Sequence, residues 1–537
     1  MKFDFSHLRG DFFGGVTTGI VALPLALAFG VASGAGPIAG LYGAIILGFF
    51  AALFGGTPTN ISGPTGPMVV VFAGLFASFP DRPDLIFAAV VVAGAIQVAL
   101  GVFRFGQYIQ LVPYPVVSGF MSGIGAIIII LQLGRLVGAE PPGDVLPALL
   151  VIPEALGDMN WSALLVGVVT LAVAYGWPAR FSTYLPGALA ALIAGTVLSV
   201  ILPGAPLLGS IPSGLPALQI PGYDHDAAAL VLEAAFVLAV LGSIDSLLTS
   251  LVADNMTRGK HDPDRELIGQ GIGNAVAGFF GSLPGAGATM RTVVNIRAGG
   301  VTNLSGIIHS LLLLAIVLVL GPLAAQIPHA ALAGILIKVG VDIIDWSYLR
   351  IAHKGPRLEL ILMLMVLGLT VFVDLITAVA AGVVLASLAF VRQVAEVQLE
   401  RVASHPEREL LPREQELVAE AGNRVNIFDF GGPLSFGAAA NLGHHVRTHA
   451  HDDAFILILD FSRVPFLDVS SARAIADIAA DARRAGRHIY VAGMREDMQR
   501  TLAGLEADRD FDADKVFPDR VQALEAALVH IRRERGG

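Results

Sequence analysis

Long apolar segments recur through the first three quarters of the chain, and polar residues fall mainly between them. Several of these segments exceed about 18 residues, which is long enough for a helix to cross the hydrocarbon core of a bilayer. Hydropathy predicts about fourteen spans, which begin near residues 13, 38, 64, 85, 112, 161, 185, 227, 266, 288, 303, 324, 357 and 375. The pattern therefore predicts an α-helical polytopic membrane protein.

The charges between the predicted spans are distributed unequally. If the N-terminus is cytoplasmic, the basic residues of the cytoplasmic connections are Arg104, Arg180, Arg258, Lys260, Arg265, Arg297, Arg350, Lys354 and Arg357. The opposite connections contain chiefly Arg82 and Arg135 as basic residues, together with several acids. An excess of basic residues on one side marks the cytoplasmic face, so both termini are expected in the cytoplasm.

The pattern changes after Arg392, where a charged and polar stretch replaces the apolar segments. The remainder alternates as a soluble α/β domain does. Strands are predicted at "NRVNIFDFGG", "FILILDFSRVPFLD" and "RHIYVAGM", and helices at "VSSARAIADIAADARRAG" and "DRVQALEAALVHIRRERGG". We therefore expect a transmembrane domain over 1–395, a linker over 396–421 and a cytoplasmic domain over 422–537.

Composition narrows the class of protein further. Hydrophobic residues make up 55% of the chain and charged residues only 15%, whereas soluble domains carry about 25% charged residues. The net charge of −10 does not suggest a nucleic-acid partner. There are no cysteines, which excludes disulfides and thiolate metal sites. No nucleophile–base pair, metal cluster or nucleotide loop is evident, so neither an enzyme nor a bound cofactor is expected.

Two of the predicted spans begin with an interrupted segment. Residues 57–76 ("TPTNISGPTGPMVVVFAGLF") and 282–296 ("SLPGAGATMRTVVNI") both open with glycine and proline beside a threonine and then continue with apolar residues. They are the third and tenth spans, seven apart. Broken helices at corresponding places in two halves indicate an inverted-repeat transporter with its site near the midplane. Their half-helix N-termini offer N–H groups and a positive dipole end to an anion.

The second interrupted segment also contains an arginine within the predicted membrane region. In the functional interpretation, Arg291 supplies positive potential to an anion, and the backbone amides of Ala288 and Thr289 donate hydrogen bonds to it. Thr65 lies at the equivalent place in the first segment and is a second candidate anion contact. Charges within the membrane are usually functional. Alternatively, Arg291 pairs with a structural carboxylate or lies at the cytoplasmic edge.

An aspartate also falls inside an apolar segment, "FVLAVLGSIDSLLTSLVAD". Thr249 follows Asp245 by four residues and so shares its helix face. A carboxylate and a hydroxyl close to unwound carbonyls suit a hard cation such as Na⁺. Burial would also let Asp245 carry a proton, and a salt bridge to Arg291 is a third interpretation. The residues leave these three alternatives open.

Several stretches resemble the SulP family of anion permeases, whose members carry a cytoplasmic STAS domain. "RGDFFGGVTTGIVALPLALAFGVASG" is similar to the first span of the family, and "DRELIGQGIGN" (264–274) is similar to its N-x-E-L-x-x-x-G-x-x-N motif, with Asp264 in place of the leading asparagine. "LDVSSARAI" resembles the STAS domain. The resemblance implies two inverted repeats of seven helices, a core domain that moves against a gate domain, and a homodimer in the lipid bilayer.

Within the family, the bicarbonate-transporter branch is the most similar. "FFAALFGGTPTNISGPTGPM", "GFMSGIGAIIIILQL", "GAGATM" and "AGILIKVGVDIIDWSYL" all read like it. The resemblance implies that Thr65, Ala288 and Thr289 contact the anion. It also implies a sodium site formed by Asp245, Thr249, Gly287, Ala288 and Thr289. We therefore predict a bicarbonate transporter with Na⁺ symport, working by alternating access in the inner membrane of a bacterium.

Arg291 departs from this branch. The sodium-coupled bicarbonate pattern has a small residue there, whereas the animal exchangers and many sulfate or dicarboxylate permeases have a basic one. A fixed positive charge there could replace the sodium ion electrostatically. The alternative is therefore a H⁺-coupled or uncoupled permease for sulfate or a dicarboxylate such as fumarate. A second alternative is a transporter-like sensor that signals to a cytoplasmic partner through its STAS domain.

Overall fold

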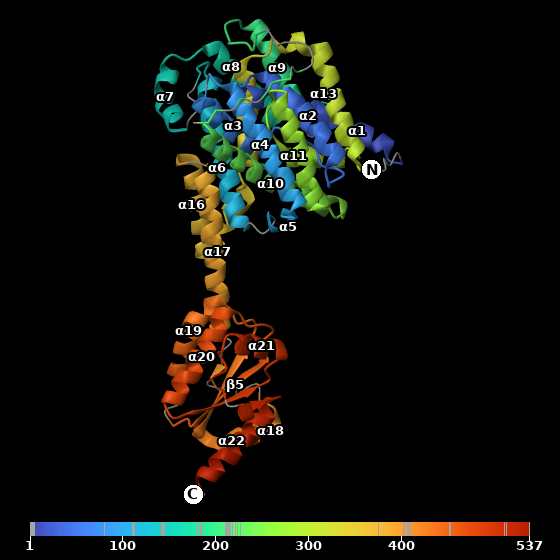
Figure 1. Ribbon diagram of the computed structural model, residues 1–537. Coiled ribbons are helices and arrows are strands. Elements are labelled where there is room, and N and C mark those ends of the chain that lie inside the picture. The colour runs from blue at the N-terminus through green and yellow to red at the C-terminus, as the bar shows by residue number, and fades with distance from the viewer. Residues whose placement is uncertain are drawn as a thin grey trace. The chain divides into compact units, whose positions relative to one another are not determined.

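The computed structural model divides the chain into two compact units, Met1–Val384 and Leu385–Gly537. Figure 1 traces both units along the chain. The structure describes residues 6–79, 81–109, 113–140, 145–178, 180–181, 185–209, 216, 218–220, 222, 224–225, 227–373, 375–400, 403–404, 410–450, 453–509, 511 and 513–535. Each unit is considered by itself below.

The N-terminal unit is built from helices. They are α1 (Leu8–Ala32), α2 (Pro37–Phe54), α3 (Gly66–Ser78), α4 (Pro83–Val102), α5 (Gly106–Ile109), α6 (Tyr114–Leu136), α7 (Val145–Gly157), α8 (Trp161–Gly176), α9 (Gly187–Ile201), α10 (Ala228–Thr257), α11 (Pro263–Phe279), α12 (Thr289–Arg297), α13 (Asn303–Ala324), α14 (His329–Ile343), α15 (Trp346–Ile351), α16 (Arg357–Phe372) and α17 (Leu375–Glu400). The last of these crosses the boundary between the two units.

Each predicted span start lies within five residues of the start of one of these helices. Among the described residues, five helices are long and apolar enough to cross a membrane, or up to six if the bent pair α7–α8 is one span. The sequence analysis did not predict α7, which meets α8 at an angle of 117°. The count of fourteen spans stays a prediction.

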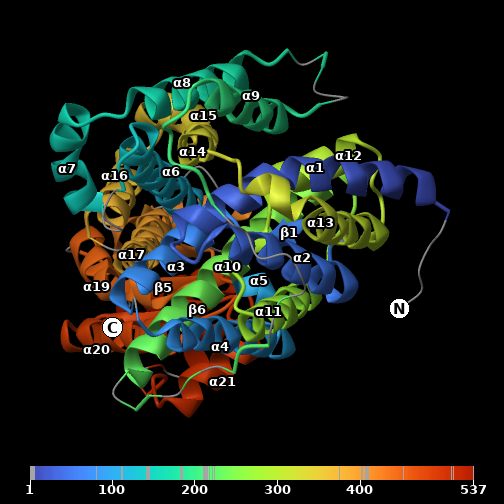
Figure 2. The ribbon, with the colours of Figure 1, turned by 90° about the horizontal axis from the view of Figure 1, so that it is seen from above.

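The helices of this unit pack in two groups. One group contains α1–α4 and α10–α13, and the other contains α6, α8, α9, α14 and α16. Figure 2 shows α1, α2, α12 and α13 on one side of the unit and α6, α14 and α16 on the other. Glycines permit the closest approaches, because a Cβ on Gly94 of α4 would lie 2.5 Å from the carbonyl oxygen of Gly271 of α11. Small residues at helix contacts are typical of membrane bundles.

A short antiparallel strand pair joins segments more than two hundred residues apart. Strand β1 (Ser62–Gly63) precedes α3, and β2 (Ala286–Gly287) precedes α12. Ser62 pairs with Gly287 and Gly63 pairs with Ala286. The two interrupted segments of the sequence are therefore adjacent in space, and α3 and α12 both begin beside this pair.

The C-terminal unit contains a five-stranded sheet in the order β3-β4-β5-β6-β7. Its strands are β3 (Ala403–Ser404), β4 (Val425–Gly431), β5 (Ile456–Arg463), β6 (His488–Ala492) and β7 (Val516–Phe517). Strands β4 to β7 are parallel, and β3 is antiparallel to β4. All the strands and helices predicted from the C-terminal sequence are present.

Helices cover both faces of this sheet. On one face, α19 (Phe436–His449), α20 (Val469–Arg484) and α21 (Glu496–Gly504) share an apolar core with β4, β5 and β6. On the other face, α18 (Pro412–Ala421) and α22 (Arg520–Arg535) form a second core. Asp468 caps α20, because its carboxylate accepts the N–H of Ser471 at 2.8 Å. This unit thus has its own cores, as a soluble domain requires.

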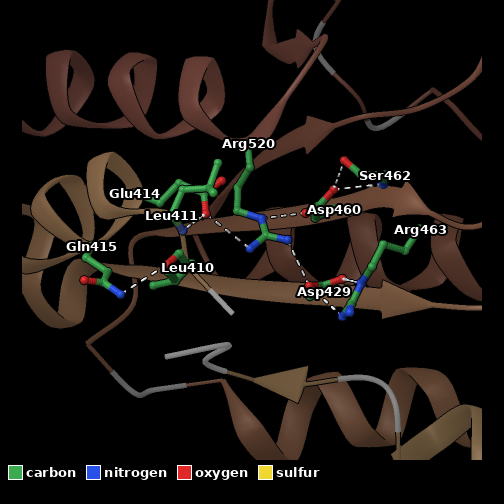
Figure 3. Close-up of polar contacts among 9 residues, drawn as sticks. All are labelled: Leu410, Leu411, Glu414, Gln415, Asp429, Asp460, Ser462, Arg463 and Arg520. Carbon is green, nitrogen blue, oxygen red and sulfur yellow. Dashed lines mark hydrogen bonds and ion pairs between the residues drawn. The ribbon is translucent and has the colours of Figure 1, made fainter. Parts of the chain in front are cut away.

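A buried charge network lies at one end of the sheet (Figure 3). Asp429 of β4 and Asp460 of β5 are neighbours in register, and neither side chain is exposed. Arg520, at the start of α22, donates from Nε to Asp460 at 2.6 Å and from Nη2 to Asp429 at 2.9 Å. Its Nη1 also lies 3.6 Å from the carboxylate of Glu414 on α18. One guanidinium therefore connects two strands and two helices.

The pKa values of Asp429 and Arg520 are shifted in this network. Burial raises the pKa of the Asp429 carboxyl above its usual value, although the charges of Arg520 and Arg463 act in the opposite direction. Burial also acts against the charge of Arg520, but the carboxylates of Asp460, Asp429 and Glu414 outweigh it and raise its pKa. The positive charge of Arg520 therefore offsets much of the free-energy cost of burying these carboxylates.

We expect Arg520→Met to destabilise the C-terminal unit by about 3 kcal/mol, because the substitution leaves buried carboxylates without their main partner. Hydrogen exchange of the β4 and β5 amides in the full-length protein measures this loss. Arg495→Met is the matched control, since Arg495 pairs with Asp497 at the surface and its loss should cost under about 1 kcal/mol. Equal exchange in the two variants would contradict the expectation.

Candidate functional site

The candidate site lies where α3 and α12 begin beside the β1–β2 pair. The backbone N–H of Ala288 donates to the carbonyl of Ile61 at 2.9 Å. The N–H of Ile61 donates in turn to the Thr292 hydroxyl at 3.0 Å. These bonds connect the segment before α3 to the first turn of α12. The structure thus brings together the two interrupted segments that the sequence analysis selected from separate spans.

The predicted anion-binding residues are at the helix starts. Thr65 is the N-cap of α3 and Ala288 is the N-cap of α12, which begins at Thr289. One detail of the sequence prediction is wrong: the N–H of Ala288 is taken up by the bond to Ile61 and is not offered to an anion. The amides of the first helical turn, beginning with Thr289, are the donors that helix geometry leaves without intrahelical partners.

Thr65 differs from most buried polar groups in this unit. Its side chain is only 7% exposed, and its hydroxyl oxygen has no hydrogen-bond partner among the described residues. Leaving a buried hydroxyl unpaired costs free energy. The hydroxyl is therefore a group that would gain from contact with a polar ligand at the start of α3.

Arg291 is in the interior of the unit rather than at its edge. The residue is 3% exposed, and its Nη2 donates to the carbonyl of Pro64 at 2.6 Å. A Cβ on Gly63 would lie 2.6 Å from its Nη1. The direct salt bridge to Asp245, one of the sequence alternatives, is not formed within 4.0 Å in the part of the chain that the structure describes. Arg291 therefore places a positive charge against the end of β1 and the start of α3.

The predicted cation-site residues also come together. The Thr249 hydroxyl donates to the carbonyl of Gly287 at 2.9 Å and lies 2.7 Å from the Thr289 hydroxyl. Asp245 is one turn earlier on α10 and is 8% exposed, and its Oδ2 has no hydrogen-bond partner among the described residues. Carboxylate, hydroxyl and carbonyl oxygens are the ligands that hard cations prefer. The donor set therefore suits an ion such as Na⁺.

The site contains groups of both positive and negative charge. The N-terminal ends of α3 and α12 and the Arg291 guanidinium supply positive potential. Asp245 supplies the negative charge, and the charge of Arg291 acts on it through space. A small cavity between α6 and α10 also reaches Asp245. An anion and a cation could thus occupy adjacent places.

Sequence analysis did not identify the polar side chains of α10 and α11 that form hydrogen bonds with the segment around β2. Ser246 accepts the N–H of Gly287 at 3.0 Å, and Asn274 exchanges two bonds with the backbone of Gly285, at 2.9 and 3.0 Å. On α11, Glu266 and Gln270 precede Asn274 at intervals of four, which puts the three on one helix face. That spacing of polar residues within "DRELIGQGIGN" was the available signal.

Two opposed half-helices in an α-helical membrane bundle, with a separate α/β domain, define the class of this protein as a membrane transporter with discontinuous helices. Residues 8–366 match the sulfate permease family, and residues 416–523 match the STAS domain. The chain therefore belongs to the sulfate permease family, as the sequence motifs predicted. It is a multi-pass membrane protein with a C-terminal STAS domain.

Similar proteins include transporters of known structure. Bicarbonate transporter BicA of Synechocystis is 43% identical over 98% of this chain and 96% of its own length. The solved transmembrane domain of a cyanobacterium bicarbonate transporter BicA is 50% identical with a TM-score of 0.67, and the match covers 70% of this chain and 99% of that one. The murine anion transporter Slc26a9, in the inward-facing state, shares the fold with a TM-score of 0.82 at 19% identity, over 98% of this chain and 92% of that one.

The contact between Gly63 and Arg291 gives a prediction about the site. Gly63→Ala would put a methyl group against the guanidinium and 3.2 Å from the Cα of Ala44. We expect the variant to fold but to lose most of the wild-type anion uptake into proteoliposomes, because Arg291 is displaced and the φ of 155° at Gly63 disfavours a side chain. Gly74→Ala in α3, where a Cβ meets nothing within 4 Å, should keep normal uptake. Normal uptake by Gly63→Ala would show that the placement of Arg291 is unimportant.

Proposed function

We propose that this protein transports bicarbonate together with Na⁺ as a secondary active symporter. The observation that carries the proposal is the meeting of two half-helix starts beside a buried aspartate whose Oδ2 lacks a hydrogen-bond partner among the described residues. The similarity to the bicarbonate transporters supports the choice of anion. The paired helix ends and Arg291 support an anionic substrate on physical grounds.

In this proposal the anion binds between the starts of α3 and α12. The Thr65 hydroxyl and the first-turn amides from Thr289 onward donate to its oxygens, and Ala288 forms the small apolar edge of the site. Arg291 contributes through its field while its Nη2 stays on the Pro64 carbonyl. Bicarbonate is small, carries one negative charge and accepts several hydrogen bonds, so it fits this set of donors.

The cation binds to the oxygens of Asp245, Thr249, Gly287, Ala288 and Thr289. Coupling follows from electrostatics, because the ionised Asp245 repels an anion placed next to it, and Na⁺ removes that repulsion. The anion in turn makes the site more favourable for the cation, since coupling between two ligands is reciprocal. Each ion therefore binds weakly alone and more tightly with the other.

Transport requires the site to face each side of the membrane in turn. We propose that the group α1–α4 with α10–α13, which contains both half-helices, moves as the core against the gate group that contains α6, α8, α9, α14 and α16. We further propose that the protein is a homodimer in the inner membrane of a bacterium, with both termini in the cytoplasm. Its domains would be the membrane domain 1–395, a linker 396–421 and the STAS domain 422–537. A cytoplasmic partner of the STAS domain would regulate this movement.

A second candidate function rests on Arg291. This buried guanidinium stabilises a dianion more than a monoanion, which favours sulfate or a dicarboxylate as substrate. A proton on Asp245 would then take the place of Na⁺. This alternative predicts that sulfate or fumarate competes with bicarbonate and that a proton gradient, rather than Na⁺, drives uptake.

The deciding experiment is uptake of labelled bicarbonate into proteoliposomes at mildly alkaline pH, with and without an inward Na⁺ gradient. We expect uptake to need Na⁺ and to be lost in Asp245→Asn, which removes the charge and keeps the side-chain size. Asp342→Asn is the matched control, because Asp342 pairs with Lys338 at a partly exposed position on α14. Uptake that is indifferent to Na⁺ would reject symport, and proton-driven sulfate or fumarate uptake would favour the second candidate.

The two threonines should affect the two ions differently. Thr65→Ala should raise the half-saturation concentration for bicarbonate roughly tenfold while that for Na⁺ changes less, as loss of one hydrogen bond to a charged group predicts. Thr289→Ala should raise both, because its hydroxyl bonds to Thr249. Thr370→Ala in α16 is the control, since that hydroxyl bonds only within its own helix, to Val366 at 2.7 Å. Unchanged values in both site variants would remove these residues from the site.

A further inference from the structure

Glu266 is a buried carboxylate on α11 that faces the segment leading into β1. It is 1% exposed, and no lysine or arginine of the described residues lies within ion-pair distance of it. Its Oε2 accepts the backbone N–H groups of Gly56 and Thr57, both at 2.9 Å. Its Oε1 accepts the side-chain amides of Asn60 at 2.7 Å and Gln270 at 2.8 Å. Four N–H donors thus take the place of a cation.

The contacts continue from Asn60 to the start of α12. The Thr292 hydroxyl donates to Oδ1 of Asn60 at 3.0 Å and accepts the N–H of Ile61 at 3.0 Å. Asn60 also packs directly against β2, since a Cβ on Gly287 would lie 2.6 Å from its Nδ2. Asn60, which lies in the segment leading into β1, is therefore held by Glu266 on one side and contacts β2 and α12 on the other.

A second route runs from α11 to β1. The Nε2 of Gln270 donates to the Ser62 hydroxyl at 2.6 Å as well as to Glu266. Ser62 is the residue of β1 that pairs with Gly287 of β2. The Glu266 carboxylate therefore connects, through one intermediate side chain in each case, to both strands beside the candidate ion sites.

The chemistry of this position favours an ionised carboxylate over an amide of the same shape. A carboxylate only accepts hydrogen bonds and has room for four donors, whereas a glutamine has one acceptor oxygen and a donor amide. Glutamine at 266 would point its NH₂ at two of the four donors and leave those donors unpaired. Bonds to a charged acceptor are also stronger than neutral ones.

We propose that Glu266 is a positioning residue that sets the separation of the two half-helix starts and so sets the affinity for both transported ions. The inference rests on the proposed function, because it assigns a role within the same site. Glu266 touches neither ion. It acts through Asn60 and Gln270 on the β1–β2 pair. Gly287 belongs to β2, and Thr65 and Thr289 follow the two strands closely in sequence.

The test is Glu266→Gln in the full-length protein, assayed for bicarbonate uptake over a range of bicarbonate and Na⁺ concentrations. We expect the half-saturation concentrations for both ions to rise roughly tenfold or more, with a smaller change in maximal rate per correctly folded molecule. Asp264→Asn is the matched control: this acid lies on the same helix, two residues away, and accepts the N–H of Gly106 at 3.0 Å. It should leave both concentrations unchanged.

If Glu266→Gln folds poorly, a second single variant and two double variants still test the positioning role. Glu266→Asp preserves the charge and should recover part of the affinity. The effects of Glu266→Gln and Asn60→Ala should not add, because they interrupt one chain of contacts. Effects of Glu266→Gln and Thr370→Ala should add. Additive effects in the first pair, or unchanged half-saturation in folded Glu266→Gln, would overturn the proposal.

A failure of the positioning role of Glu266 can be distinguished from a failure of the proposed transport function. If the wild type carries sulfate or a dicarboxylate instead of bicarbonate, the proposed function fails while Glu266 is tested with that anion in the same way. If the wild type carries bicarbonate and the Glu266 variants bind both ions normally, only the positioning role fails. Faster hydrogen exchange at residues 56–57, whose amides bond to Glu266 directly, and at 61–63 and 286–288 in Glu266→Gln, without change elsewhere in the unit, is the result expected of positioning.

Discussion

The pairing of Ser62–Gly63 with Ala286–Gly287 is the interaction on which the rest of the membrane unit depends. A helix that begins in the middle of a bilayer leaves backbone groups without partners, and hydrocarbon offers none. Here each break supplies partners for the other, so α3 and α12 can both start beside the strand pair. The residues must be small, because a Cβ on Gly285 would lie 2.1 Å from the carbonyl oxygen of Gly63.

Side chains of the neighbouring helices α10 and α11 also supply hydrogen-bond partners to the strand pair. Helices α10 and α11 direct serine, threonine, asparagine, glutamine and glutamate toward the strand pair, and most of their polar atoms have partners. Against that background, the Thr65 hydroxyl and Asp245 Oδ2 are informative, because they lie beside the candidate ion sites and are among the few buried side-chain atoms of the described residues that lack a hydrogen-bond partner. The same low-dielectric surroundings that make an unpaired group costly also strengthen its interaction with a bound ion.

The C-terminal unit follows the rules of a soluble domain and depends on a different balance. Its sheet has an apolar core on each face, and Arg520 holds a buried charge network at one end of the sheet. Glu414 belongs to α18, which lies within the segment 396–421 predicted as a linker but packs on the sheet, so the same guanidinium also holds the start of this domain. Removing a single charge there would affect the sheet and the helices together.

The sequence by itself determined the membrane class, where most of the long helices begin, the α/β order of the C-terminal domain and the two interrupted spans, because hydropathy and periodicity are local properties. Even the candidate residues Thr65, Asp245 and Arg291 were identifiable as polar groups in apolar surroundings. Only the tertiary structure decided their partners. It placed Arg291 on a carbonyl instead of on Asp245 and occupied the Ala288 amide. It also gave Glu266 its four donors. Apart from the bond of Gln270 to Glu266, which lies within one helix, these contacts join residues more than two hundred positions apart, and a linear pattern contains no information about which of them meet.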